Sequence, residues 1–202
     1  MTEAALTPER ILEAAEDVLR RFGPAKATVV DIARELGVSH GSVYRHFPSK
    51  AALRDAVTEG WLASVSEPLE AVAAEEGPAP ERLRRWLDLL IESKRSRALK
   101  DPELFATYVQ LAGESREVIT AHVGTLTGQL ARIIADGSER GEFGVADPEA
   151  AARAVFDATS RFHNPVHAAQ WSDPAIDADF EAVWSLALAG LTVPNRSRQG
   201  SV

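Results

Sequence analysis

Residues His40 to Lys50 concentrate side chains that can donate hydrogen bonds to nucleic acid. At helical spacing, the donors of residues 40–46 fall on one face and the apolar side chains fall on the other. The donor face carries His40, Ser42, Arg45 and His46, with Gly41 between them and Tyr44 at the edge. Val43 and Phe47 form the apolar face. The major groove of DNA admits a short helix of this kind, so the pattern indicates a recognition helix.

The residues before this segment predict the elements that position it. Thr28 is a good N-cap, and Asp31 three residues later can complete a capping box. The helix that follows buries Ile32, Ala33 and Leu36 on one face and ends at Gly37, which tolerates a left-handed turn. Ser39 then caps the second helix. Together these signals predict a helix-turn-helix over 28–47.

The run from Ile32 to Leu53 resembles the DNA-binding signature of TetR-family transcriptional regulators. The matching positions read I-A-x-x-L-G-V-S-x-G-S-V-Y-x-H-F-x-S-K-x-x-L. So many residues at fixed spacing make the match specific. It covers the first quarter of the chain closely, and the remainder is similar to the family only in length and helical character.

The resemblance implies that Tyr44, His46 and Lys50 contact phosphates, as suits a phenol, an imidazole and an ammonium near helix ends. Arg45 can donate two hydrogen bonds to one guanine, a contact worth about 1–3 kcal/mol of discrimination against other bases. Tyr44 could instead be a core residue with its hydroxyl at the rim. The predicted DNA-binding residues are Thr28, Ser39, His40, Gly41, Ser42, Tyr44, Arg45, His46 and Lys50.

Composition limits the class of protein. The 202 residues carry a net charge of −8 and contain no cysteine, which excludes disulfides and thiol catalysis. Residues 1–50 hold seven basic and seven acidic residues, so the excess negative charge lies outside the predicted DNA-binding segment. No signal peptide and no apolar run of about 20 residues is apparent, and we expect a cytoplasmic protein.

The hydrophobic pattern predicts an all-α chain, because apolar residues recur at helical spacing and no run alternates as a strand would. We expect a helix-turn-helix domain over 1–53, a helical effector-binding and dimerisation domain over 54–193, and a disordered tail over 194–202. Helices are predicted over 8–22, 50–74, 81–99, 115–140, 147–163 and 176–191, with a further one starting at Asp101-Pro102.

In TetR-family proteins the second domain holds a small-molecule pocket. By resemblance we expect a largely apolar effector pocket here, lined by Trp86, Phe105, Tyr108, His122 and Phe162. The aromatic residues could equally be ordinary core residues at helical spacing, and His122 could be a core histidine with satisfied hydrogen bonds.

No motif predicts catalysis, a cofactor or a metal. His163 and His167 have the spacing of two metal ligands on a helix, but Pro165 lies between them and no third ligand is evident. Nucleophile elbows, phosphate-binding glycine loops and zinc-protease motifs are absent from the sequence. We therefore expect a chain that is not an enzyme, with no cofactor and no metal.

The family likeness implies a homodimer formed through helices 147–163 and 176–191, whose two recognition helices read a palindromic operator. A small apolar effector would release the repressor from DNA by favouring another geometry. One alternative is an activator, or a regulator controlled by a protein partner with no small-molecule ligand. Another is a carrier or enzyme on a helical scaffold.

Overall fold

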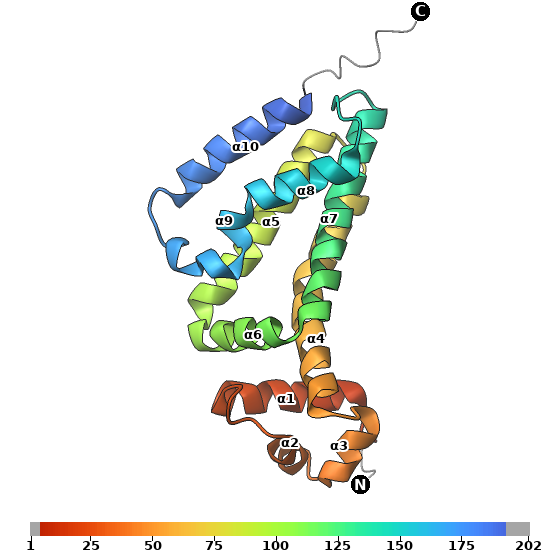
Figure 1. The fold of residues 1–202 in the computed structure, drawn as a ribbon, viewed down its shortest axis with the longest axis vertical. Helices are drawn as coiled ribbons and strands as arrows, with labels where there is room; N and C mark the ends of the chain where they lie inside the picture. The colour runs from red at the N-terminus through yellow and green to blue at the C-terminus, as the bar shows by residue number, and fades with distance from the viewer. Residues whose placement is uncertain (1–4, 193–202) are drawn as a thin grey trace, which may run out of the picture. The chain divides into compact units, whose positions relative to one another are not determined.

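The computed structural model describes residues 5–192, and all regular structure in them is helical (Figure 1). This confirms the predicted all-α class. The helices are α1 (Pro8–Phe22), α2 (Val29–Glu35), α3 (His40–His46), α4 (Lys50–Ala74), α5 (Ala79–Lys100), α6 (Pro102–Glu114), α7 (Arg116–Glu139), α8 (Pro148–Ala158), α9 (Ser160–His163), the 3-10 helix η1 (Pro165–Gln170) and α10 (Ile176–Thr192). The predicted tail, 194–202, lies outside the described residues.

Helix starts follow the capping signals in the sequence. Thr7, Asp101 and Asp147 each precede a proline at the first helical position, and each side chain accepts a hydrogen bond from a backbone N–H of the first turn. Gly23 ends α1 with φ at +70°, a conformation that favours glycine. None of the described residues forms a helix long and apolar enough to cross a membrane.

The single helix predicted over 147–163 is wrong, because the chain breaks at Thr159 into α8 and α9. The Thr159 hydroxyl donates to the carbonyl oxygens of Val155 at 2.9 Å and Phe156 at 3.2 Å. Bonds of this kind compete with the regular helical ladder. The prolines on either side of this region, Pro148 and Pro165, begin the helices that follow them.

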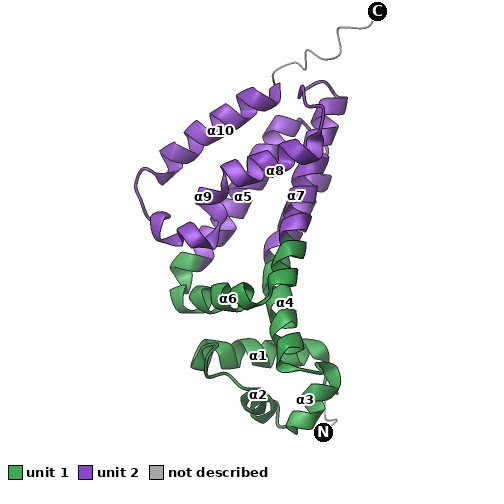
Figure 2. Ribbon diagram, viewed as in Figure 1, with its two compact units in different colours: residues 1–64, 98–122 green, residues 65–97, 123–202 purple. Residues whose placement is uncertain are grey.

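The described chain divides into two compact units (Figure 2). Unit 1 comprises residues 1–64 and 98–122, and unit 2 comprises residues 65–97 and 123–202. Compactness therefore groups α6 with the helix-turn-helix, although the predicted domain boundary lay at residue 53. The boundary at 53 separates the expected DNA-binding segment from the expected effector-binding segment rather than two compact units, and it stays a prediction.

Each unit has its own core. In unit 1, Ile11, Val18, Ile32 and Val43 are buried around the helix-turn-helix. In unit 2, the core consists of residues from α4, α5, α7, α8, α9 and α10, among them Leu69, Leu83, Trp86, Leu90, Leu130, Ile133, Ile134, Phe162 and Phe180. Burial of these apolar side chains is the main favourable term for folding.

Arg82, a residue of α5, is buried in unit 2 and contacts the end of α4. Its guanidinium donates to the carbonyl oxygens of Val72 and Ala73 in the last turn of α4, where carbonyl groups run out of regular helical partners. It also pairs with Asp136 at 3.0 Å. One charged side chain thereby caps α4 and connects it to α7.

Candidate nucleic-acid interface

Reciprocal hydrogen bonds between Thr28 and Asp31 fix the start of α2. The Asp31 backbone N–H donates to the Thr28 hydroxyl oxygen at 3.2 Å. The Thr28 hydroxyl and backbone N–H donate in turn to the Asp31 carboxylate at 2.6 Å and 3.2 Å. The bond from the hydroxyl lowers the pKa of Asp31, which keeps the carboxylate charged. The predicted capping box is therefore present.

A tight turn sets the angle between α2 and α3. Gly37 adopts φ of +67°, the left-handed conformation expected of it. The next residue, Val38, donates its N–H to the Ala33 carbonyl at 2.9 Å. Ser39 then caps α3, because its hydroxyl accepts from the Ser42 N–H at 3.2 Å. These bonds hold the start of α3 in place without using any side chain of its outer face.

Val43 anchors α3 from behind. Its side chain is fully buried, and α3 packs on α2, which packs on α1. Phe47, the second residue of the predicted apolar face, is half-buried. The inner face of α3 therefore faces the core of unit 1, as predicted.

The opposite face of α3 is open to solvent. His40, Gly41, Arg45 and His46 are exposed, and Ser42 is half-buried. Tyr44 is 41% exposed, which rules out the alternative that it is a core residue. The predicted donor side chains are thus brought together on one accessible surface.

Short polar contacts organise this surface. The Arg45 guanidinium donates to the Ser42 hydroxyl at 3.1 Å, and the hydroxyls of Ser42 and Ser39 lie 3.0 Å apart. The rings of His40 and Tyr44 meet edge to face at 6.4 Å. Arg45 has no carboxylate partner within residues 5–192, so its charge is available to an external ligand.

Thr28 and Lys50 lie at helix starts beside this surface. They differ in the donors that each leaves available to a phosphate. Both donors of Thr28, its hydroxyl and its N–H, already bond to Asp31. A phosphate would have to replace those bonds and approach a carboxylate, so the proposed Thr28 contact is the weaker one. Lys50 is exposed and forms no ion pair within the described residues.

The five predicted effector residues do not share one unit. Phe105 and Tyr108 belong to unit 1, where Tyr108 stacks on Trp61 at 4.8 Å and Phe105 meets the same ring edge to face. His122 is half-buried in the same unit. The remaining two, Trp86 and Phe162, are buried in the core of unit 2.

His163 is a core residue rather than an exposed ligand. Its Nε2 lies 3.2 Å from the Phe156 carbonyl oxygen and 3.3 Å from the Thr159 hydroxyl. Burial lowers the pKa of His163 to about 4. Across residues 5–192, no three His, Cys, Asp or Glu side chains are grouped as a metal ion would require.

A polar cluster around Arg54 was missed by sequence reasoning. The Arg54 guanidinium contacts Asp55 at 3.0 Å, Glu114 at 3.2 Å and the Ser115 hydroxyl at 3.2 Å. Ser115 in turn donates to Asp55 at 2.6 Å. Glu114 and Ser115 lie 60 and 61 positions from Arg54 in the chain, so no local pattern could have indicated this contact between α4 and the end of α6.

Two family models match the chain. Residues 11–57 match the bacterial regulatory proteins of the tetR family, and residues 79–184 match the tetracyclin repressor-like C-terminal domain. The first match contains α2 and α3 with the exposed donor face, and the second covers more than half of the chain.

A curated relative is similar to part of the chain. The nucleoid occlusion factor SlmA of Vibrio atlanticus is 34% identical over 84 residues, which are 41% of this chain and 43% of that protein. The chain thus spans only about two fifths of the length of the curated relatives it matches.

Solved structures share the fold over nearly the whole chain. SmeT, the repressor of a Stenotrophomonas maltophilia multidrug efflux pump, is 21% identical with a TM-score of 0.68, over 99% of this chain and 97% of that one. FadR of Bacillus subtilis, solved with stearoyl-CoA, is 21% identical with a TM-score of 0.62, over 92% and 100%. With an N-terminal and a C-terminal model both matched, this chain belongs to the TetR family of transcriptional regulators.

Proposed function

We propose that the chain is a homodimeric repressor that a small apolar effector releases from a palindromic operator. The observation that carries the DNA-binding part is the exposed donor face of α3, held from behind by the buried Val43. His40, Gly41, Ser42 and Arg45 are the residues that we propose to read bases. Tyr44, His46 and Lys50 hold the phosphates, with Ser39 and Thr28 beside them. Binding chromosomal DNA implies a cytoplasmic location.

The proposed dimer forms through the outer faces of α8 and α10. On α8, Val155 and Ala152 are buried within the single chain, so the interface uses the opposite side of the helix. Exposed apolar residues line that side at about one-turn spacing on both helices. All are alanines except Leu186, which is 76% exposed. The exposed set is Ala150, Ala154 and Ala158 on α8, with Ala182, Leu186 and Ala189 on α10. Two copies joined here present two copies of α3 to one duplex.

Light scattering tests the dimer. Leu186→Glu places a charge in the proposed interface and should reduce the mass at micromolar concentration toward the 21.8 kDa of one chain. Leu99→Glu is the matched control, because Leu99 is 63% exposed and lies outside α8 and α10. A wild-type protein that is monomeric would contradict the proposal.

The effector would bind in the helical body and favour a conformation in which the two copies of α3 no longer match successive major grooves. Phe105, Tyr108 and His122 of unit 1, and separately Trp86 and Phe162 of unit 2, are the residues that we propose for effector contact, each unit taken by itself. The four aromatic side chains among them support an apolar ligand. Solved relatives of the same fold include FadR of Thermus thermophilus with lauroyl-CoA and RolR with resorcinol. Acyl-CoA thioesters and resorcinol are therefore the first compounds to try.

A gel shift with the native promoter region tests the function directly. We expect a sequence-specific complex at low protein concentration, which acyl-CoA or resorcinol dissociates. No complex with any native DNA would contradict the proposal and favour a carrier or enzyme on the same scaffold.

A second candidate is a regulator that answers to a protein partner and has no small-molecule ligand. The similarity over 84 residues to a nucleoid occlusion factor, whose name gives no small-molecule ligand, is the observation that favours it. Specific DNA binding that no small molecule reverses would support this candidate over the first.

A further inference from the structure

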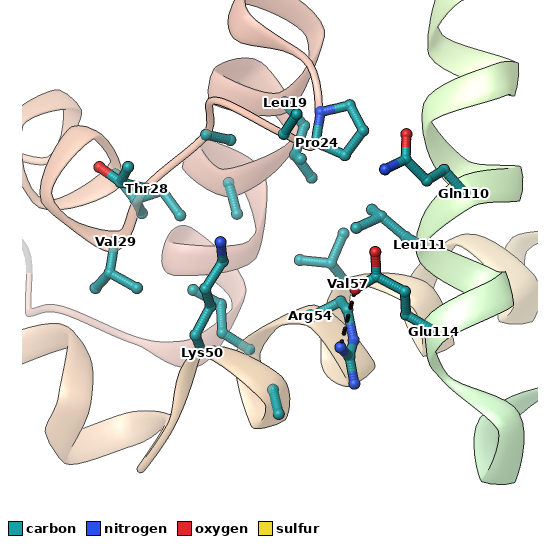
Figure 3. Close-up of a pocket in the computed structure, with 16 residues that line it drawn as sticks. Leu19, Pro24, Thr28, Val29, Lys50, Arg54, Val57, Gln110, Leu111 and Glu114 are labelled. Carbon is teal, nitrogen blue, oxygen red and sulfur yellow. Dashed lines mark hydrogen bonds and ion pairs between the residues drawn. The ribbon is translucent and has the colours of Figure 1, made fainter.

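Unit 1 contains a cavity that lies apart from the proposed effector residues. Its volume is about 350 Å³, and α1, α2, the first turns of α4 and the end of α6 surround it (Figure 3). None of Trp86, Phe105, Tyr108, His122 and Phe162 lines it. The volume lies at the low end of the range of about 300–1,000 Å³ that small-molecule sites occupy.

The lining of the cavity is mostly apolar. Eleven of its sixteen residues are apolar, including Leu19, Pro24, Val57 and Leu111. The other five are Thr28, Lys50, Arg54, Gln110 and Glu114. An apolar wall with a few polar groups is the composition of a site that binds an amphipathic molecule.

The charged residues of the lining leave one cation uncompensated. Arg54 pairs with two carboxylates, Glu114 of the lining at 3.2 Å and Asp55, which lies outside the lining, at 3.0 Å. Lys50 forms no ion pair within residues 5–192, and its side chain extends among the lining residues in Figure 3. Among the lining residues, Lys50 is thus the cation that forms no ion pair inside the described range, and it lies beside an apolar surface.

We propose that this cavity binds a small amphipathic carboxylate. The hydrocarbon part of the ligand contacts Leu19, Pro24 and Leu111, and its carboxylate pairs with Lys50. A single negative charge matches the single unpaired ammonium, and the apolar body gains by leaving water.

A ligand bound in the cavity competes with DNA for the Lys50 ammonium. This step rests on the proposed function, in which Lys50 holds an operator phosphate. An ammonium paired with a bound carboxylate cannot also neutralise a phosphate, so the ligand removes one phosphate contact from each protomer. The cavity is thus a second regulatory site, built into the DNA-binding unit itself.

Binding is measured first without DNA, by calorimetry and by NMR, with octanoate as the probe and octanol as its uncharged counterpart. We expect octanoate to bind at millimolar concentration or below and to shift resonances of residues around Leu19, Val57 and Leu111. Octanol should bind more weakly. No binding of octanoate, or shifts confined to unit 2, would overturn the proposal.

Three variants locate the charge and the cavity. Lys50→Met keeps most of the side chain but removes the ammonium, and it should weaken octanoate binding by at least about tenfold. Gln110→Phe fills the cavity from the exposed side of α6 and should abolish binding, with a urea unfolding curve to show that the variant folds. Lys26→Met, an exposed lysine outside the lining, should bind as the wild type does. Equal octanoate affinity in Lys50→Met and wild type would overturn the role of Lys50.

The salt dependence of DNA binding separates this inference from the proposed function. Saturating octanoate should lower the slope of log K against log salt by about one per protomer, and should have no further effect on Lys50→Met. If the wild type binds its promoter but octanoate leaves the slope unchanged, the competition is wrong and the repressor stands. If octanoate binds the cavity but no native DNA binds, the cavity stands and the repressor is wrong.

Discussion

The indole N–H of Trp86 donates to the side-chain oxygen of Gln129 at 3.0 Å, and both side chains are buried in unit 2. The amide nitrogen of Gln129 donates in turn to the Ser66 carbonyl at 3.1 Å. Gln129 therefore satisfies one polar group of α5 and one of α4 from its place on α7. A buried polar side chain of this kind is tolerated because its hydrogen bonds are made.

Replacing Gln129 by leucine should lower the free energy of unfolding by about 1–3 kcal/mol. The leucine is of similar size, but it leaves the buried Trp86 N–H without the acceptor that Gln129 supplies. Urea unfolding measures the change. Gln110→Leu is the control, because Gln110 is exposed, and it should change stability by no more than about 0.5 kcal/mol. Equal stability of the two variants would show that the buried bonds contribute little.

A second prediction concerns Gly137, where α7 passes close to Phe143. A Cβ at Gly137 would lie 2.5 Å from the Phe143 ring and 2.6 Å from the Ala79 Cβ. Both neighbours are buried and cannot move aside easily. Gly137→Ala should therefore destabilise the protein by about 1–3 kcal/mol, measured by thermal or urea unfolding.

Gly128 on the same helix provides the matched control. A Cβ there meets nothing within 4 Å. Gly128→Ala should raise stability by up to about 1 kcal/mol, because alanine favours a helix interior over glycine. If both substitutions change the free energy of unfolding in the same direction, close packing at Gly137 is not what decides the result.

The local structure of the DNA-binding segment could be predicted from the sequence, because its signals are themselves local. Thr28 with Asp31, Gly37, and Ser39 each act within four residues, and each behaves in the structure as its type and spacing predict. The alternation of Val43 with exposed donors follows from helical geometry alone.

Contacts between distant segments could not be predicted in the same way. Nothing near Arg82 distinguishes it from its exposed neighbour Arg85, although it alone turns inward to cap α4. The Arg54 cluster and the cavity beside it depend on α6 packing near α4 within unit 1, which periodicity does not reveal. The break at Thr159 was missed because its hydroxyl bonds to the backbone, whereas the surrounding residues continue the helical pattern.

A third prediction tests base reading by Arg45. Arg45→Lys keeps the positive charge but loses the two-pronged donor that matches guanine. In competition gel shifts, discrimination between the operator and a variant at the contacted base should fall by about 1–3 kcal/mol. Affinity for unrelated DNA should remain close to that of the wild type, since the charge is retained.

The same assay with Arg45→Ala should show the loss of discrimination together with weaker binding to all DNA. A lysine variant that discriminates as well as the wild type would mean that Arg45 contacts only the phosphate backbone.

The last prediction is a pH dependence of stability that comes from His163. Burial lowers the pKa of His163 to about 4 in the folded chain, and the nearby charge of Lys94 acts in the same direction. In the unfolded chain a histidine titrates near about 6.5. Between these values the unfolded state binds more protons, so stability is complete above pH 6.5 and falls as the pH drops toward 4.

The size of the effect follows from the difference between the two pKa values. It amounts to about 3 kcal/mol over the whole window. His163→Gln removes the titrating group, so its urea midpoint should fall less steeply than that of the wild type between pH 6.5 and 4. His167→Gln, on η1, removes an imidazole but leaves His163 in place, and it should follow the wild-type curve. Parallel pH profiles for the wild type and His163→Gln would mean that the folded protein accepts a proton at His163 without loss, which a neutral core histidine cannot do.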